Sequence, residues 1–124
     1  MDSEIERLVA ALQDAVGDGL RGVFYGEFRE RDYAVAYASE AALDGYSADQ
    51  IGDVVDDVAL EKLHSDRKSE LHEPLGEYTA SVEVFEDGVN VVVLEYDVPT
   101  VFVEMDGDVT NVSPALEAGR DALG

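Results

Sequence analysis

The sequence predicts an α+β domain in which helices pack on an antiparallel sheet of five strands. Short β-rich runs follow one another as hairpins, first within residues 20–38 and then within residues 78–105. Segments with apolar residues at helical spacing precede, separate and follow these runs. The chain has 124 residues, enough for one core and too few for two. We therefore expect a single domain over residues 1–124.

The N-terminal segment predicts one helix followed by a hairpin. Ser3 and Glu6 form a capping-box pattern, and apolar residues then recur at helical spacing until Gly17 offers a stop. Residues 20–28 and 33–38 alternate as two strands on either side of a charged turn. The expected order begins with a helix and two strands.

Two helices are expected between the hairpins, and one helix after the last strand. Ser39 opens a short helical turn, and Ser47 with Gln50 forms a capping box for a longer helix. Ser65 is expected to cap a further short turn after a break in that helix. Ser113-Pro114 starts the final helix, since proline is favoured at the first helical position. The helices and strands are expected in the order α-β-β-α-α-β-β-β-α.

Residues 78–105 predict a meander of three consecutive strands. Asp87-Gly88 lies between two β-rich runs, and a two-residue loop of this type supplies the positive φ angles of a type I′ turn. Across this turn we expect Val84 to pair with Val91, on a valine-rich face that forms core. The opposite face is mixed and is expected to be only partly covered; it carries Phe85, Val92, Leu94 and Tyr96 together with Thr79, Ser81, Glu83 and Asn90.

The charge of the chain is strongly negative. There are 29 Asp and Glu against 8 Lys and Arg, a formal net charge of -21, and the acidic residues are spread evenly along the chain. Self-repulsion opposes compaction at low ionic strength, so we expect salt to stabilise the fold. Even acidity with only two lysines, Lys62 and Lys68, resembles proteins of salt-in halophilic archaea. A direct nucleic-acid partner is not expected, because phosphate binding requires a basic footprint.

The remaining composition points to a cytoplasmic protein with no assigned catalytic, cofactor-binding or metal-binding residue. The chain contains no cysteine, which excludes disulfides and thiolate metal sites. No run approaches the ~18 apolar residues of a membrane span, and the acidic N-terminus does not resemble a signal peptide. His64 and His72, the two histidines, are better explained as capping or surface residues than as metal ligands. Neither a cofactor nor a membrane partner is expected.

One segment resembles the PAS family of sensor domains. Residues 37–52, YASEAALDGYSADQIG, are similar to the PAS strand-to-helix segment, with matches at Gly45, Tyr46, Ser47, Ile51 and Gly52. Residues 63–67 resemble the PAS His-Pro-Asp-Asp-Arg segment, although serine replaces its proline. Some PAS domains hold a small ligand between sheet and helices. This resemblance implies an apolar cavity, which Phe24, Tyr46 and Tyr96 would line.

The order of helices and strands is also similar to that of the profilin-like roadblock and longin modules. These modules share with PAS domains a five-stranded antiparallel sheet in the strand order 2-1-5-4-3, which the resemblance implies for this chain. In the roadblock arrangement the first and last helices would lie together on one face of the sheet, with the middle helix on the other. Both families act chiefly through dimerisation or partner binding.

These observations predict a non-enzymatic, salt-adapted regulatory or protein-interaction module that acts as a homodimer or adaptor. The alternative is a PAS-type small-ligand sensor. The expected partner surface is the mixed face of the meander, with Phe85, Val92, Leu94 and Tyr96. Arg67 and Lys68 form a basic spot that either contacts an acidic partner or neutralises neighbouring acids.

Overall fold

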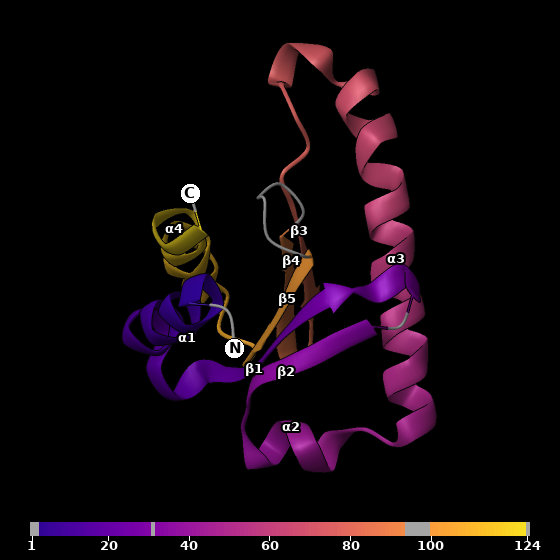
Figure 1. Ribbon diagram of the computed structural model, residues 1–124. Coiled ribbons are helices and arrows are strands. Elements are labelled where there is room, and N and C mark those ends of the chain that lie inside the picture. The colour runs from indigo at the N-terminus through magenta and orange to yellow at the C-terminus, as the bar shows by residue number, and fades with distance from the viewer. Residues whose placement is uncertain (1–2, 31, 94–99, 124) are drawn as a thin grey trace.

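A computed structural model describes residues 3–30, 32–93 and 100–123 (Figure 1). In this part of the chain the helices are α1 (Ser3–Val16), α2 (Glu40–Gly45), α3 (Ala48–Leu71) and α4 (Val112–Leu123). The strands are β1 (Leu20–Glu27), β2 (Asp32–Ala38), β3 (Ala80–Phe85), β4 (Gly88–Val93) and β5 (Thr100–Met105). They form one antiparallel sheet in the order β2-β1-β5-β4-β3. The predicted fold class and strand order are confirmed.

Helices α1 and α4 lie side by side on one face of the sheet (Figure 1). The apolar stripe of α1 is fully buried there through Ile5, Leu8 and Leu12, which recur at helical spacing. Val103 and Met105 of β5 belong to the same core. Burying an aliphatic side chain of this size contributes about 1.5–3 kcal/mol relative to leaving it exposed. This face therefore holds the main core.

Helix α3 covers the opposite face of the sheet with a smaller core. Val55 and Val58 on the helix pack with Val92 and Phe102 of the sheet and with Phe28, which follows β1. Much of the C-terminal half of α3 extends past the sheet (Figure 1). The face that was expected to be only partly covered is thus covered in its centre by the chain itself.

Helix α3 is continuous, so the expected break before Ser65 is wrong. Ser47 and Gln50 do form the predicted capping box at its start. Ser65 does not cap a new turn but is buried within the C-terminal half of the helix, where its carbonyl accepts a 3.1 Å hydrogen bond from the Ser69 hydroxyl. The oxygen of that hydroxyl accepts a 2.8 Å bond from the Tyr78 N–H, which fixes the chain that returns toward β3. Nothing between residues 53 and 71 is a glycine or proline, so no local signal ends the helix.

The β3–β4 hairpin turns one residue earlier than expected. Its two loop residues are Glu86 and Asp87, and Gly88 is the first residue of β4, paired with Phe85. Val84 therefore pairs with Val89, and the predicted pairing with Val91 is off by two residues. A shift of two preserves which side chains share a face, so the face assignments are unchanged.

The valine-rich face is core only in its inner strand. Val89 and Val91 of β4 are buried, but Val82 and Val84 of the edge strand β3 are exposed. The reason is position, because β4 lies between two strands whereas β3 has a neighbour on one side.

None of the helices in the described part of the chain is long and apolar enough to cross a membrane.

Candidate functional site

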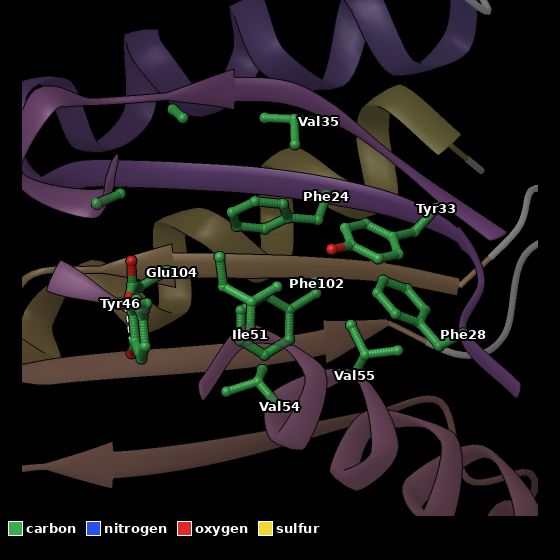
Figure 2. A pocket seen from close by; sticks show the side chains of 12 residues that line it. Phe24, Phe28, Tyr33, Val35, Tyr46, Ile51, Val54, Val55, Phe102 and Glu104 are labelled. Atoms are coloured by element: carbon green, nitrogen blue, oxygen red, sulfur yellow. Dashed lines mark hydrogen bonds between the residues drawn. The ribbon is translucent and has the colours of Figure 1, made fainter. Parts of the chain in front are cut away.

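A cavity of about 150 Å³ lies between the sheet and the helices α2 and α3. It is lined almost wholly by apolar and aromatic side chains, from β1, β2 and β5 on one side and from α2, α3 and the link between them on the other (Figure 2). The lining residues are Phe24, Phe28, Tyr33, Val35, Ala38, Ala42, Tyr46, Ile51, Val54, Val55, Phe102 and Glu104.

Aromatic pairs form much of the cavity wall. The rings of Phe24 and Phe102 meet at a tilt of 58° with centroids 5.9 Å apart, and those of Phe28 and Tyr33 stack at 5.8 Å. Aromatic pairs in these geometries are favourable beyond their buried area. The wall is therefore built from rings that support one another.

A bulge at the edge of the sheet completes this wall. β1 pairs Val23 with Tyr37 and Phe24 with Val35, so β2 contains one extra residue between the two pairs. Val35 then lines the cavity, whereas Tyr37 packs against the core under α1 and α4. Val35 and Tyr37 are two residues apart and would share a face in a regular strand, so the bulge is what sends them to opposite faces of the sheet.

The polar end of the cavity is a hydrogen bond between Tyr46 and Glu104. The Tyr46 hydroxyl donates to Glu104 Oε1 at 2.9 Å (Figure 2). Glu104 lies on β5 and is only 8% exposed, although it is acidic. Tyr46 is held between two helix termini, because α2 ends at Gly45 and Ser47 caps α3. The pKa of Tyr46 is raised, first by burial and then by the hydrogen bond to Glu104 and its charge, while Arg21 acts in the opposite direction.

A groove of about 690 Å³ adjoins the cavity on the same face of the sheet. The two share Tyr46, Val54, Phe102 and Glu104, so the Tyr46–Glu104 end of the cavity faces the groove. The remaining lining residues are mostly acidic: Arg21, Asp53, Asp57, Glu83, Phe85, Glu86, Asp87, Gly88 and Asn90. Arg21 is the basic residue among them, and its Nη1 donates to the Asp87 carbonyl at 2.7 Å.

The exposed edge of β3 is a second candidate surface. Val82, Val84 and Phe85 are 39%, 60% and 55% exposed. Phe85 also lines the groove, so the edge and the groove are continuous. An edge strand presents unpaired backbone donors and acceptors to any strand that docks beside it.

The residues predicted to bind a partner on the meander are separated in the structure. Phe85 is exposed, as a partner contact requires, but Val92 is buried beneath α3 with Phe102. Val92 therefore cannot contact a partner, and its assignment to the partner surface is corrected. The physical reason is that α3 covers the centre of the mixed face. Leu94 and Tyr96 lie outside the described residues.

The predicted basic spot lies on another part of the molecule. Arg67 and Lys68 are exposed on the C-terminal half of α3, and Lys68 Nζ lies 5.0 Å from the centroid of the Tyr78 ring. That distance is within the range of a cation–π contact, so Lys68 is held against its own chain. Asp57, which lines the groove with Phe85, lies ten residues before Arg67, about 15 Å along the helix axis. The structure does not bring the basic spot and Phe85 together.

The histidines do not converge with other ligand residues. His72 is the C-cap residue of α3, where its N–H donates to the Lys68 carbonyl at 3.0 Å, and His64 is exposed on the same helix. Within the described ranges, no group of three or more His, Asp or Glu side chains is placed to hold a metal ion.

Sequence reasoning anticipated part of the cavity and missed its charged residue. Phe24 and Tyr46 line it as the PAS resemblance implied, and the third expected residue, Tyr96, lies outside the described ranges. Glu104 was not singled out. One signal was available in the sequence. Glu104 lies two residues after Phe102 in β5 and therefore shares its face of the strand, and a covered face normally carries apolar side chains.

Comparisons with known proteins bear on the family and on the fold. A family model described as "Domain of unknown function (DUF7522)" matches residues 6–124. The gliding protein MglB from Thermus thermophilus has a TM-score of 0.54 and 15% identity, over 99% of this chain and 93% of its own. A structure of MglB with a tetrameric arrangement gives 0.54 and 16%, over 99% and 95%. These likenesses support the roadblock-like fold over the PAS resemblance. No curated protein matches the sequence significantly.

Proposed function

We propose that this chain, which belongs to the DUF7522 family, is a non-enzymatic, salt-adapted regulatory or adaptor module that self-associates through the edge of β3. A cytoplasmic location is part of the proposal. The observation that carries it is the exposure of Val82, Val84 and Phe85 on one edge strand. A second copy of β3 could pair with this edge and extend the sheet, while these side chains are buried between the copies.

The edge of β3 supports this role better than the opposite edge of the sheet. β2, the other edge strand, exposes one large aliphatic side chain, Val35, which also lines the cavity. β3 exposes apolar side chains on both of its faces, since Val84 and Phe85 point to opposite sides of the strand. Pairing of two β3 strands would therefore bury apolar surface on both faces of the extended sheet. The tetrameric arrangement of MglB, a protein with the same fold, is compatible with assembly of this fold.

The basic spot would make a second contact between copies, separate from the edge of β3. Each copy carries a net charge of -21, so the surface of a second copy is itself acidic. Arg67 and Lys68 are proposed to meet that acidic surface and to offset part of the repulsion between copies. Lys68 already contacts the Tyr78 ring of its own chain, so Arg67 is proposed to be the stronger of the two contacts with the second copy.

Light scattering at molar salt tests the self-association. We expect the wild-type chain to be a dimer or larger, and Val84→Lys to shift it at least about tenfold toward the monomer, because a charge would be buried at the interface. Val35→Lys is the matched control, because Val35 is 52% exposed and lies on β2, the opposite edge of the sheet. A wild-type monomer at molar salt, or equal effects of both substitutions, would overturn the proposal.

We propose small-ligand sensing as a second function, because the cavity is a specific observation in its favour. The pocket of about 150 Å³ between the sheet and α3 is lined almost wholly by apolar and aromatic side chains, with few polar groups, as sites for small ligands commonly are. This function is independent of self-association and can fail or succeed without it.

A further inference from the structure

We propose that the cavity binds a small organic cation: a primary ammonium group on an apolar body about the size of one benzene ring. The inference rests on the ligand-sensing function and specifies the chemistry of its ligand. It depends on the size of the cavity, on its aromatic wall, on the buried carboxylate of Glu104 and on the charge of the adjoining groove.

The size of the cavity limits the apolar body of the ligand. Its volume is about 150 Å³, and an apolar cavity of about 150 Å³ is known to hold one benzene molecule. The wall offers few polar groups besides the hydroxyls of Tyr33 and Tyr46 and the carboxylate of Glu104. A ring or a short chain of about six carbons therefore fits, and a sugar or nucleotide does not.

The wall also selects the sign of the ligand's charge. Phe24, Phe28, Tyr33, Tyr46 and Phe102 present aromatic rings to the cavity. The face of an aromatic ring attracts a cation and repels an anion. None of the described lining residues is basic, so an anionic ligand would have no positive partner there.

Glu104 supplies the partner for the ammonium group. Its carboxylate is 8% exposed, and the hydrogen bond given to it within the described residues comes from Tyr46, to Oε1. A carboxylate can accept about four hydrogen bonds, and a hydrogen bond from an ammonium to a carboxylate is stronger than one between neutral groups. An ammonium donating to Oε2 would pair this charge and leave the Tyr46 hydrogen bond in place. In Figure 2 the Tyr46–Glu104 pair lies at one end of the cavity, with Phe28 and Val55 toward the other, so an apolar body can extend away from the carboxylate.

The adjoining groove provides a route of entry that favours cations. Asp53, Asp57, Glu83, Glu86 and Asp87 line it, and Arg21 is its described basic residue. Because the groove shares Glu104 and Tyr46 with the cavity, its negative potential lies at the charged end of the cavity. A groove of one sign raises the local concentration of opposite charge, less so at high salt.

Titration of the full chain with three probes of one size tests the proposal. Benzylamine carries the ammonium, benzyl alcohol is its neutral counterpart and benzoate is an anion. We expect NMR titration at constant salt to give benzylamine an affinity at least about tenfold above that of benzyl alcohol, with no binding of benzoate.

Three variants locate the binding. Glu104→Gln keeps an acceptor for Tyr46, and we expect it to lower benzylamine affinity at least about tenfold while benzyl alcohol binds as before. Glu117→Gln removes one exposed carboxylate on α4, on the other face of the sheet, as a matched control and should change benzylamine affinity by less than about twofold. Ala42→Leu partly fills the cavity and should weaken both ligands.

The outcomes separate this proposal from the functions on which it builds. Equal affinity for benzylamine and benzyl alcohol in the wild-type chain would overturn the ammonium assignment but leave a ligand cavity, and this comparison needs no variant to fold. Failure of every probe to bind would overturn the assignment and the sensing function together. Self-association is measured separately and stands or falls by the Val84→Lys result.

Discussion

At the scale of single residues, the Tyr46–Glu104 hydrogen bond links two segments that are far apart in the chain. It joins the residue between α2 and α3 to the middle of the sheet, 58 positions later. The bond lies at the polar end of the cavity, beside the groove, and ties the start of α3 to the sheet. It therefore contributes to the stability of the fold as well as to the shape of the site.

The raised pKa of Tyr46 predicts a specific pH dependence. Because the folded pKa lies above the ordinary value of 10.0, the folded state holds this proton more tightly than the unfolded chain does. The resulting stabilisation is present in full below pH 10 and is lost as the pH rises through the folded pKa. Tyr46→Phe should lower the free energy of unfolding by about 0.5–1 kcal/mol at pH 7, toward the low end because Tyr46 is 40% exposed and solvent screens the interaction, with the difference shrinking above pH 10.

Denaturant unfolding at a series of pH values from 7 to 11 measures this difference. Tyr37→Phe is the control, because Tyr37 packs on the other face of the sheet and its substitution leaves the Tyr46–Glu104 bond intact. If the free energy of unfolding of Tyr46→Phe differs from that of the wild-type chain by the same amount at every pH, the stabilisation does not depend on protonation of the Tyr46 hydroxyl, and the prediction is wrong.

At the scale of helices and strands, the signals that lie close together in sequence were predictive. Ser47 and Gln50 are three residues apart and form the predicted capping box, because both partners belong to one turn of chain. The turn of the β3–β4 hairpin was misplaced by one residue because the Asp87-Gly88 signal assigned Gly88 to the loop, whereas Gly88 begins β4 and does not have the positive φ that the signal implies. The helix break expected at Ser65 does not occur. A serine that is buried within a helix and a serine that caps a helix cannot be told apart from the local sequence alone.

The projecting half of α3 gives a prediction for the basic spot. Arg67→Glu together with Lys68→Glu should weaken self-association by roughly threefold to tenfold, because like charges would then face the acidic surface of the second copy. Sedimentation equilibrium at constant salt measures the effect. Arg120→Glu, an exposed reversal on α4, is the matched control. An unchanged dissociation constant in the double variant would assign Arg67 and Lys68 to the neutralisation of their own neighbours.

At the scale of the whole molecule, the sequence was sufficient for the fold and insufficient for the site. The order of helices and strands and their resemblance to known modules were enough to predict the sheet, because short connections between successive strands allow few topologies. The cavity could be predicted only in part, since Phe24 and Tyr46 were named through a family resemblance. Glu104 belongs to no such segment, and its hydrogen-bond partner Tyr46 lies 58 positions away in the sequence and comes near only in the folded chain.

The net charge of the whole chain predicts that its stability depends strongly on salt. The 29 acidic residues repel one another through solvent over about 10 Å at 0.1 M salt but over only about 3 Å at 1 M. A gain of about 2 kcal/mol on screening would raise the midpoint of thermal unfolding by roughly 6–12 °C for a domain of this size. Circular dichroism melts between 0.1 and 2 M KCl measure the shift.

Asp14→Lys with Asp121→Lys, both exposed positions, should reduce the rise of the midpoint with salt, because fewer like charges then require screening. If the midpoint of thermal unfolding does not rise with salt, or rises equally in the double variant, repulsion among the acidic residues does not make the stability depend on salt. The proposal of salt adaptation would then lose its basis.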